Sequence, residues 1–168
     1  MRDYWLAKLI SSVTEVDSRK RLQKSIYLLQ RAGCPLRLSY ILHYYGPYSF
    51  ELAGLINQLD GAEIIKETQV GPAYKSRIMP FGNKVIKDFE KTEVGVKARK
   101  ALNSFISRFK VLNKEDLWLL ELAATTAYFH KDNWEEAKRQ TARFKHLKED
   151  DSKLEKAIEI AGEFVATP

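Results

Sequence analysis

Tyrosine side chains gather around one turn in the first third of the chain. They are Tyr40, Tyr44, Tyr45 and Tyr48, on either side of Gly46-Pro47. A tyrosine combines an apolar ring with a polar tip, which suits a surface that becomes buried against another molecule. The alternative is that the rings cover the core beneath the turn, because alternate residues of a strand point inwards. The spacing leaves both interpretations open.

Cations form a second group, on one face of a helix predicted before this turn. The polar face has members three and four residues apart, namely Lys20, Gln23, Lys24, Tyr27, Gln30 and Arg31. Lysine and arginine side chains in such a stripe can bind the phosphates of a nucleic acid. A charged face of this kind is also typical of a helix that is simply solvated. The stripe therefore permits nucleic-acid binding without requiring it.

The sequence lacks the common catalytic and cofactor motifs. It has no GxGxxG, no Walker loop, no GxSxG elbow and no HExxH. The three histidines lie far from one another and from Cys34 along the chain, so we predict no metal site. Acids near a lysine at 63–66 and 88–91 resemble a nuclease site only loosely, and such spacing is common on charged surfaces. We expect no cofactor and no enzymatic activity.

Hydrophobic spacing and turn signals predict the elements that position these residues. The predicted order is a helix at 3–15, a helix from Asp17 or Ser18 to about Arg31, a strand or extended turn at 37–45, a helix capped by Ser49 and ended by Gly61, strands at 64–70 and 74–79, and a helix at 81–90. A helix-turn-helix followed by a β-hairpin is the winged-helix arrangement, in which the hairpin is the wing.

The third of these helices occupies the place of a recognition helix, which enters the major groove of DNA in helix-turn-helix proteins. Its exposed positions are predicted to include Glu51, Asn57 and Gln58, and it contains no lysine or arginine. An acidic helix between phosphates is repelled and gains nothing from counterion release. The composition of this helix therefore favours a protein partner over DNA.

After Thr92 the sequence predicts helices only. The predicted capping pairs are Asn113 with Asp116, Asp132 with Glu135, and Ser152 with Glu155. The helix at 113–130 is apolar all round, which is typical of a buried helix. We therefore predict a mainly α fold with a minor β part. A winged-helix-like domain at 1–91 with a β-hairpin wing would be followed by a helical subdomain at 92–168 packed on it.

Composition and charge narrow the class of protein. The chain has 168 residues, 45% of them hydrophobic, and a net charge of +6. Residues 1–91 hold 14 Lys+Arg and 9 Asp+Glu, whereas residues 92–168 hold 14 and 13, so the basic excess lies in the first half. A single cysteine, Cys34, suits a reducing compartment and is expected to be buried. The start lacks a secretion-signal pattern and no apolar run could span a membrane, so we expect a cytoplasmic protein.

Two motifs carry a resemblance to known proteins. The first is RLQKSIYLL at 21–29, and the second is HYYGPYS at 43–49. Together they make the chain similar to the uncharacterised YwgA-like proteins of bacteria and archaea, and more distantly to Panacea antitoxin domains, which share the Y-G-P turn. The YwgA-like resemblance implies no activity and no catalytic residues. The Panacea resemblance implies that the protein binds and neutralises a partner toxin.

These observations lead to two hypotheses about function. The first is a non-enzymatic regulatory binding module, of antitoxin-like or adaptor type, that recognises a protein partner. Its predicted contact residues are Tyr44, Tyr45, Gly46, Pro47, Tyr48 and Glu51. The alternative is a winged-helix transcriptional regulator that binds DNA, for which the predicted contact residues are Arg19, Lys20, Lys24, Tyr27, Lys75 and Arg77. Assembly into a homodimer stays open.

Overall fold

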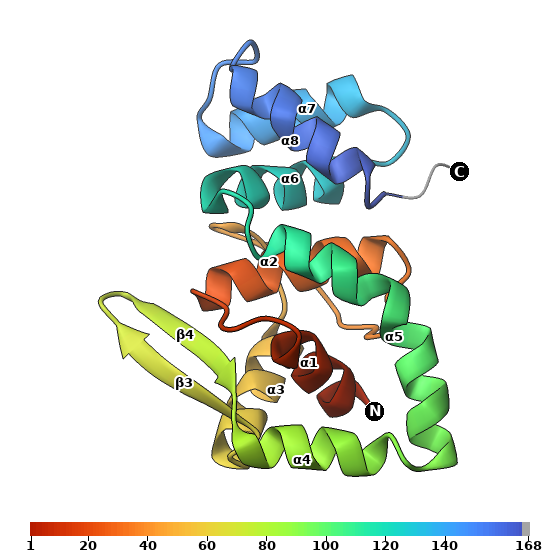
Figure 1. Cartoon of the computed structure of the whole chain (residues 1–168). Coiled ribbons are helices and arrows are strands. Elements are labelled where there is room, and N and C mark those ends of the chain that lie inside the picture. Colours follow the sequence, from red (N-terminus) through yellow and green to blue (C-terminus); the bar gives the residue numbers. More distant parts are fainter. Residues whose placement is uncertain (166–168) are drawn as a thin grey trace.

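A computed structural model describes residues 1–165 of the chain (Figure 1). Within them, eight helices and two antiparallel hairpins confirm the predicted mainly helical fold with a small β part. The elements are α1 (Arg2–Ser11), α2 (Arg19–Arg31), β1 (Ile41–His43), β2 (Gly46–Tyr48), α3 (Phe50–Gly61), β3 (Ile65–Val70), β4 (Ala73–Ile78), α4 (Pro80–Phe89), α5 (Glu93–Leu112), α6 (Leu117–Phe129), α7 (Trp134–Lys145) and α8 (Ser152–Gly162).

The winged-helix order of the first half is confirmed, and the wing is the hairpin β3–β4. Its strands pair from Ile65 opposite Ile78 to Val70 opposite Ala73, and they project away from the helices (Figure 1). The predicted first helix was too long, because α1 ends at Ser11. The chain beyond it runs to Val16, whose backbone exchanges two hydrogen bonds with Ser76 of β4, at 2.8 and 2.9 Å. This short bridge ties the base of the wing to the body.

The segment predicted as one strand or extended turn at 37–45 is instead the first arm of a second, short hairpin. Strands β1 and β2 pair with Ile41 opposite Tyr48 and His43 opposite Gly46. The tip is therefore Tyr44-Tyr45, two residues before the predicted turn at Gly46-Pro47. Pro47 lies within β2, where its missing N–H is tolerated because a two-stranded ribbon has only edge strands.

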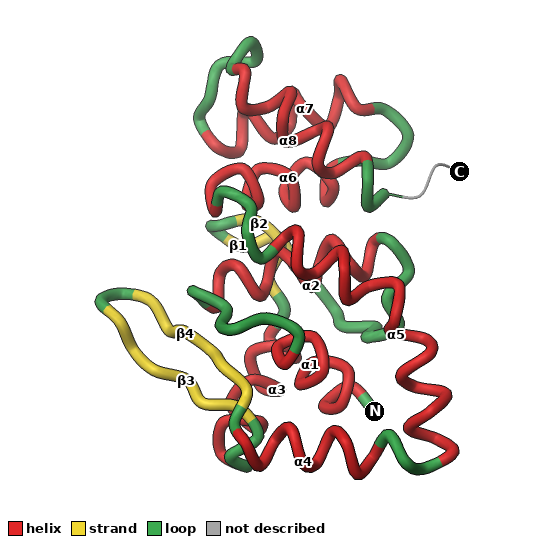
Figure 2. Tube along the Cα trace, viewed as in Figure 1, coloured by secondary structure: helices red, strands yellow, loops and turns green. Residues whose placement is uncertain are grey.

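Helix α2 lies between the first-half helix α1 and the later helix α6, and it is central in the molecule (Figure 2). The prediction of a solvated polar stripe on this helix is wrong for its middle, since Gln23, Lys24 and Tyr27 are all buried. The physical reason is that α6 and β2 pack on the polar face, while the apolar face covers the core of the first half. Two opposite faces of one helix are thus buried.

Helix α6 is buried on all sides from Leu120 to Ala127, as its apolar sequence predicted. It packs on α2 and β2 on one side and on α7 and α8 on the other (Figure 1). The predicted helix starts were wrong by up to three residues. The capping side chains are Asp116 for α6, Asn133 for α7 and Asp151 for α8, each of which accepts a backbone N–H of the first turn. In residues 1–165 no helix is long and apolar enough to cross a membrane.

Candidate binding surface

Two buried side chains of α2 hold the hairpin β1–β2 in place. The Gln23 amide donates to the Ser49 carbonyl and accepts from the Ser49 N–H, both at 2.8 Å, so it binds the backbone as a neighbouring strand would. At the next residue, the Lys24 ammonium donates to the Pro47 carbonyl at 2.7 Å. The Ser49 hydroxyl then caps α3 by accepting from the Leu52 N–H. We call Gln23, Lys24, Pro47 and Ser49 the hairpin clamp.

Gly46 is required where the hairpin meets α6. Its φ of +90° lies in the left-handed region, which favours glycine. A Cβ at this position would overlap the Thr125 hydroxyl, which donates to the Glu121 carbonyl of the same helix. The backbone of β2 can therefore approach α6 closely only because residue 46 has no side chain.

The tyrosines of this turn divide between the core and the surface, which resolves the two interpretations of the sequence. Tyr40 packs edge-on against Tyr27 at 4.9 Å between ring centroids, and burial raises its pKa. Tyr44 and Tyr45 at the hairpin tip are 79% and 51% exposed, with their rings edge-on at 5.1 Å. Tyr48 is half-buried and packs edge-on against Phe50, the exposed first residue of α3.

Exposed and half-buried apolar side chains thus lie along the hairpin and at the start of α3. We call this set the aromatic hairpin surface, formed by Ile41, Tyr44, Tyr45, Tyr48 and Phe50. Phe50 is 67% exposed and Ile41 48%. Beside it, Glu51 is held by an N–H of Ser39 at 2.7 Å and by the guanidinium of Arg2 at 3.4 Å, and these contacts lower the pKa of its carboxyl group.

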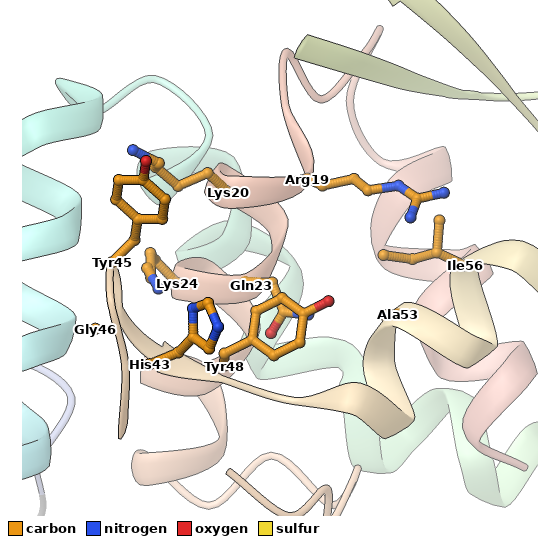
Figure 3. A pocket seen from close by; sticks show the side chains of 10 residues that line it. All are labelled: Arg19, Lys20, Gln23, Lys24, His43, Tyr45, Gly46, Tyr48, Ala53 and Ile56. Atoms are coloured by element: carbon orange, nitrogen blue, oxygen red, sulfur yellow. The ribbon is translucent and has the colours of Figure 1, made fainter. Parts of the chain in front are cut away.

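A small cavity of about 170 Å³ lies behind this surface, between the hairpin, α2 and α3 (Figure 3). His43 and Tyr48 point into it from the hairpin, and Ala53 and Ile56 close it from α3. Lys24 lies at its inner edge, where burial lowers the pKa of the ammonium to about 7, against the opposing pull of Glu121. Both the ammonium and the neutral amine can donate the hydrogen bond to Pro47.

Most of the predicted phosphate contacts are already engaged within the protein. Arg19 binds the Glu67 carboxylate through its Nε at 3.0 and 3.1 Å, and Lys75 pairs with Glu15 at 2.7 Å. Lys20 pairs with Glu121 at 3.0 Å, while Lys24 and Tyr27 are buried. Arg77 remains exposed on the wing. Four of the six residues therefore lie on α2, but they do not form one solvent-exposed face that could bind phosphates.

Sequence reasoning missed the carboxylate at the centre of this region. Glu121 of α6 is only 2% exposed, and it forms ion pairs with Lys20 of α2 and Lys145 of α7. A signal was present, because Glu121 is the one charged residue in the segment Leu117–Phe129. A charge inside a helix that is apolar all round must find partners when the helix is buried.

Comparison with known proteins shows a distant similarity to another protein but assigns the chain to no family. No protein-family profile matches the chain. It is 38% identical over 64 residues to the uncharacterised protein YwgA of Bacillus subtilis (strain 168). The matched stretch spans 38% of this chain and 39% of that protein, so the similarity covers about two fifths of each. A distant similarity to YwgA is thereby established, whereas the resemblance to Panacea domains stays a prediction.

Proposed function

We propose that this protein is a non-enzymatic binding module that recognises a protein partner through the aromatic hairpin surface. The observation that carries the proposal is the exposure of Tyr44 and Tyr45 at the tip of a ribbon that the hairpin clamp holds, together with exposed Phe50 at the start of α3. Contiguous exposed aromatic groups are typical of protein interfaces, where a few such side chains supply most of the binding energy. A fixed ribbon loses little conformational entropy on binding.

An antitoxin-like or adaptor role fits this arrangement, because such a protein acts by occupying the surface of another. The Y-G-P turn, which carries the predicted resemblance to Panacea domains, comprises Tyr45 at the tip of the same ribbon and Gly46 and Pro47 of β2. We expect the protein to act in the cytoplasm, with Glu51 at the edge of the contact. Its carboxyl group binds Arg2 and the Ser39 N–H, which fixes its position beside the ribbon.

The test compares partner capture by two double variants. In Tyr44→Ala/Phe50→Ala the surface loses two exposed rings, and in the control Phe81→Ala/Val111→Ala two other exposed apolar residues are truncated elsewhere. We expect the wild type and the control to retain one stoichiometric protein from the native host, and the first variant to lose it. The purified pair should then show at least a tenfold weaker affinity for the first variant. Equal retention by all three proteins would reject the proposal.

The DNA-binding alternative has one observation in its favour. On the wing, Lys66 and Arg77 lie directly opposite each other and both are exposed. Like charges at opposed strand positions repel, and a phosphate between them would relieve the repulsion. This alternative predicts that a labelled random duplex binds with a steep salt dependence, and that a Lys66→Glu/Arg77→Glu variant loses the binding.

A further inference from the structure

A second, larger cavity opens beside the hairpin tip. It has a volume of about 510 Å³ and lies between the tip, α2, α6 and the end of α7. Cavities of this size are typical of small-molecule sites. Its lining holds three cations (Lys20, Arg143 and Lys145), the carboxylate of Glu121, one histidine and four aromatic side chains, among them Tyr45 and Trp118.

The charged groups form a built site with a net positive charge. The side chains of Glu121 and Lys145, which form an ion pair, are only 3% and 6% exposed. The Lys20 ammonium forms a second ion pair with Glu121, at 3.0 Å. Three cations against one carboxylate leave a formal charge of +2 in the lining. Arg143 is exposed at the rim, and no carboxylate within residues 1–165 forms an ion pair with it. The cavity therefore attracts an anion with more than one negative charge.

The aromatic groups supply flat apolar walls next to these cations. The Lys20 ammonium lies 4.2 Å from the centre of the Tyr45 ring. The Lys145 ammonium lies 5.2 Å from the Phe144 ring and 5.7 Å from that of Trp118. A ligand that places an anionic group on the cations therefore has its remaining part against ring faces, where a planar ring stacks well.

We propose that this cavity binds a nucleoside phosphate. The phosphate would bind Arg143 first, with Lys20 and Lys145 beside it, because these two ammonium groups share the single carboxylate of Glu121 and so leave positive charge unpaired. The base would pack against the aromatic wall, on the ring of Trp118 or Tyr45. Inorganic phosphate alone would fill only a small part of about 510 Å³, and an uncharged nucleoside would leave the positive charge unbalanced. The inference stands apart from protein-partner binding, although Tyr44 and Tyr45 border both sites.

The test is calorimetric titration of the full chain with AMP, GMP, CMP and UMP, beside adenosine and inorganic phosphate. We expect at least one nucleotide to bind with micromolar affinity, and adenosine and phosphate to bind at least tenfold more weakly. Arg143→Glu should weaken nucleotide binding at least tenfold. This exposed residue can be changed without disturbing the buried pair of Glu121 and Lys145. The control Arg139→Glu changes the same charge on the same helix outside the cavity and should bind as the wild type does.

Three results would overturn the inference. The first is no binding of any of the four nucleotides at millimolar concentration. The second is an equal loss in Arg143→Glu and Arg139→Glu, which would reveal a general charge effect. The third is binding of inorganic phosphate as tight as that of the nucleotides, which would exclude stacking on the rings. None of these depends on whether a protein partner is found.

Discussion

Replacing Lys24 with methionine should change how the stability of the protein depends on pH. Lys24 is buried, and burial lowers its pKa from 10.5 to about 7 in the folded protein. Between these two values the unfolded chain binds a proton that the folded protein does not, so the free energy of unfolding rises with pH. Below pH 7 both states are protonated and the folded protein carries the full penalty. Above pH 10.5 both are neutral and the penalty is absent.

The size of the effect follows from the same two values. A pKa difference from 10.5 to about 7 corresponds to roughly 5 kcal/mol in total, or up to ~1.4 kcal/mol for each pH unit in this interval. In Lys24→Met this contribution is absent, while the loss of the hydrogen bond to Pro47 costs about 1–3 kcal/mol at every pH. The wild type should therefore gain stability over Lys24→Met by about 2 kcal/mol between pH 7.5 and 9.5.

Urea unfolding of both proteins at pH 7.5, 8.5 and 9.5 measures this difference. Groups that titrate in both proteins, such as the Cys34 thiol, whose pKa is raised to about 11 by burial, cancel in the comparison. Lys110→Met removes an exposed lysine and should follow the wild type at all three pH values. Parallel curves for the wild type and Lys24→Met would refute the reasoning, because the amine would then titrate alike in the folded and unfolded states.

Three further predictions concern the same region and its neighbour. Gly46→Ala should lower the free energy of unfolding by about 2–4 kcal/mol through left-handed backbone strain and overlap with Thr125, whereas Gly33→Ala, with open space around it, should cost less in the same urea assay. Glu121→Leu should cost about 3–5 kcal/mol by leaving buried Lys145 unpaired, and adding Lys145→Met should recover part of the loss in thermal unfolding. Burial lowers the pKa of His130, so stability should fall as the pH drops from 7 to 5, and His130→Gln should flatten that fall.

Features that depend on neighbouring residues could be predicted from the sequence. The cap at Ser49, the end of α2 before Gly33 and the pairing of the wing were all visible in short patterns. The exposed positions of α3 followed from its period of 3.6 residues. The buried position of α6 could also be predicted, because a helix with apolar residues on all sides has no polar face that water could solvate.

Burial of the polar face of α2 could not be predicted, because α6, which covers much of it, lies about a hundred residues further along the chain. Arg21 illustrates this. Its guanidinium binds Asp17 within the same turn, which the sequence permits, but it also donates to the carbonyls of Leu112 and Glu115 at the end of α5. Nothing in the local spacing distinguishes such a buried, fully bonded arginine from one that is solvated. The phosphate-binding hypothesis relied on that distinction.

The two motifs that carry the resemblance to YwgA-like proteins turn out to be parts of one structural unit. Gln23 and Lys24 belong to the first motif, and their hydrogen bonds run to Pro47 and Ser49 of the second. These clamp residues are buried, so a relative that shares them shares the way the ribbon is held. Recognition would depend instead on the exposed side chains at the tip, such as Tyr44. Under the proposed function, the tip residues are therefore the ones to compare when a partner is assigned.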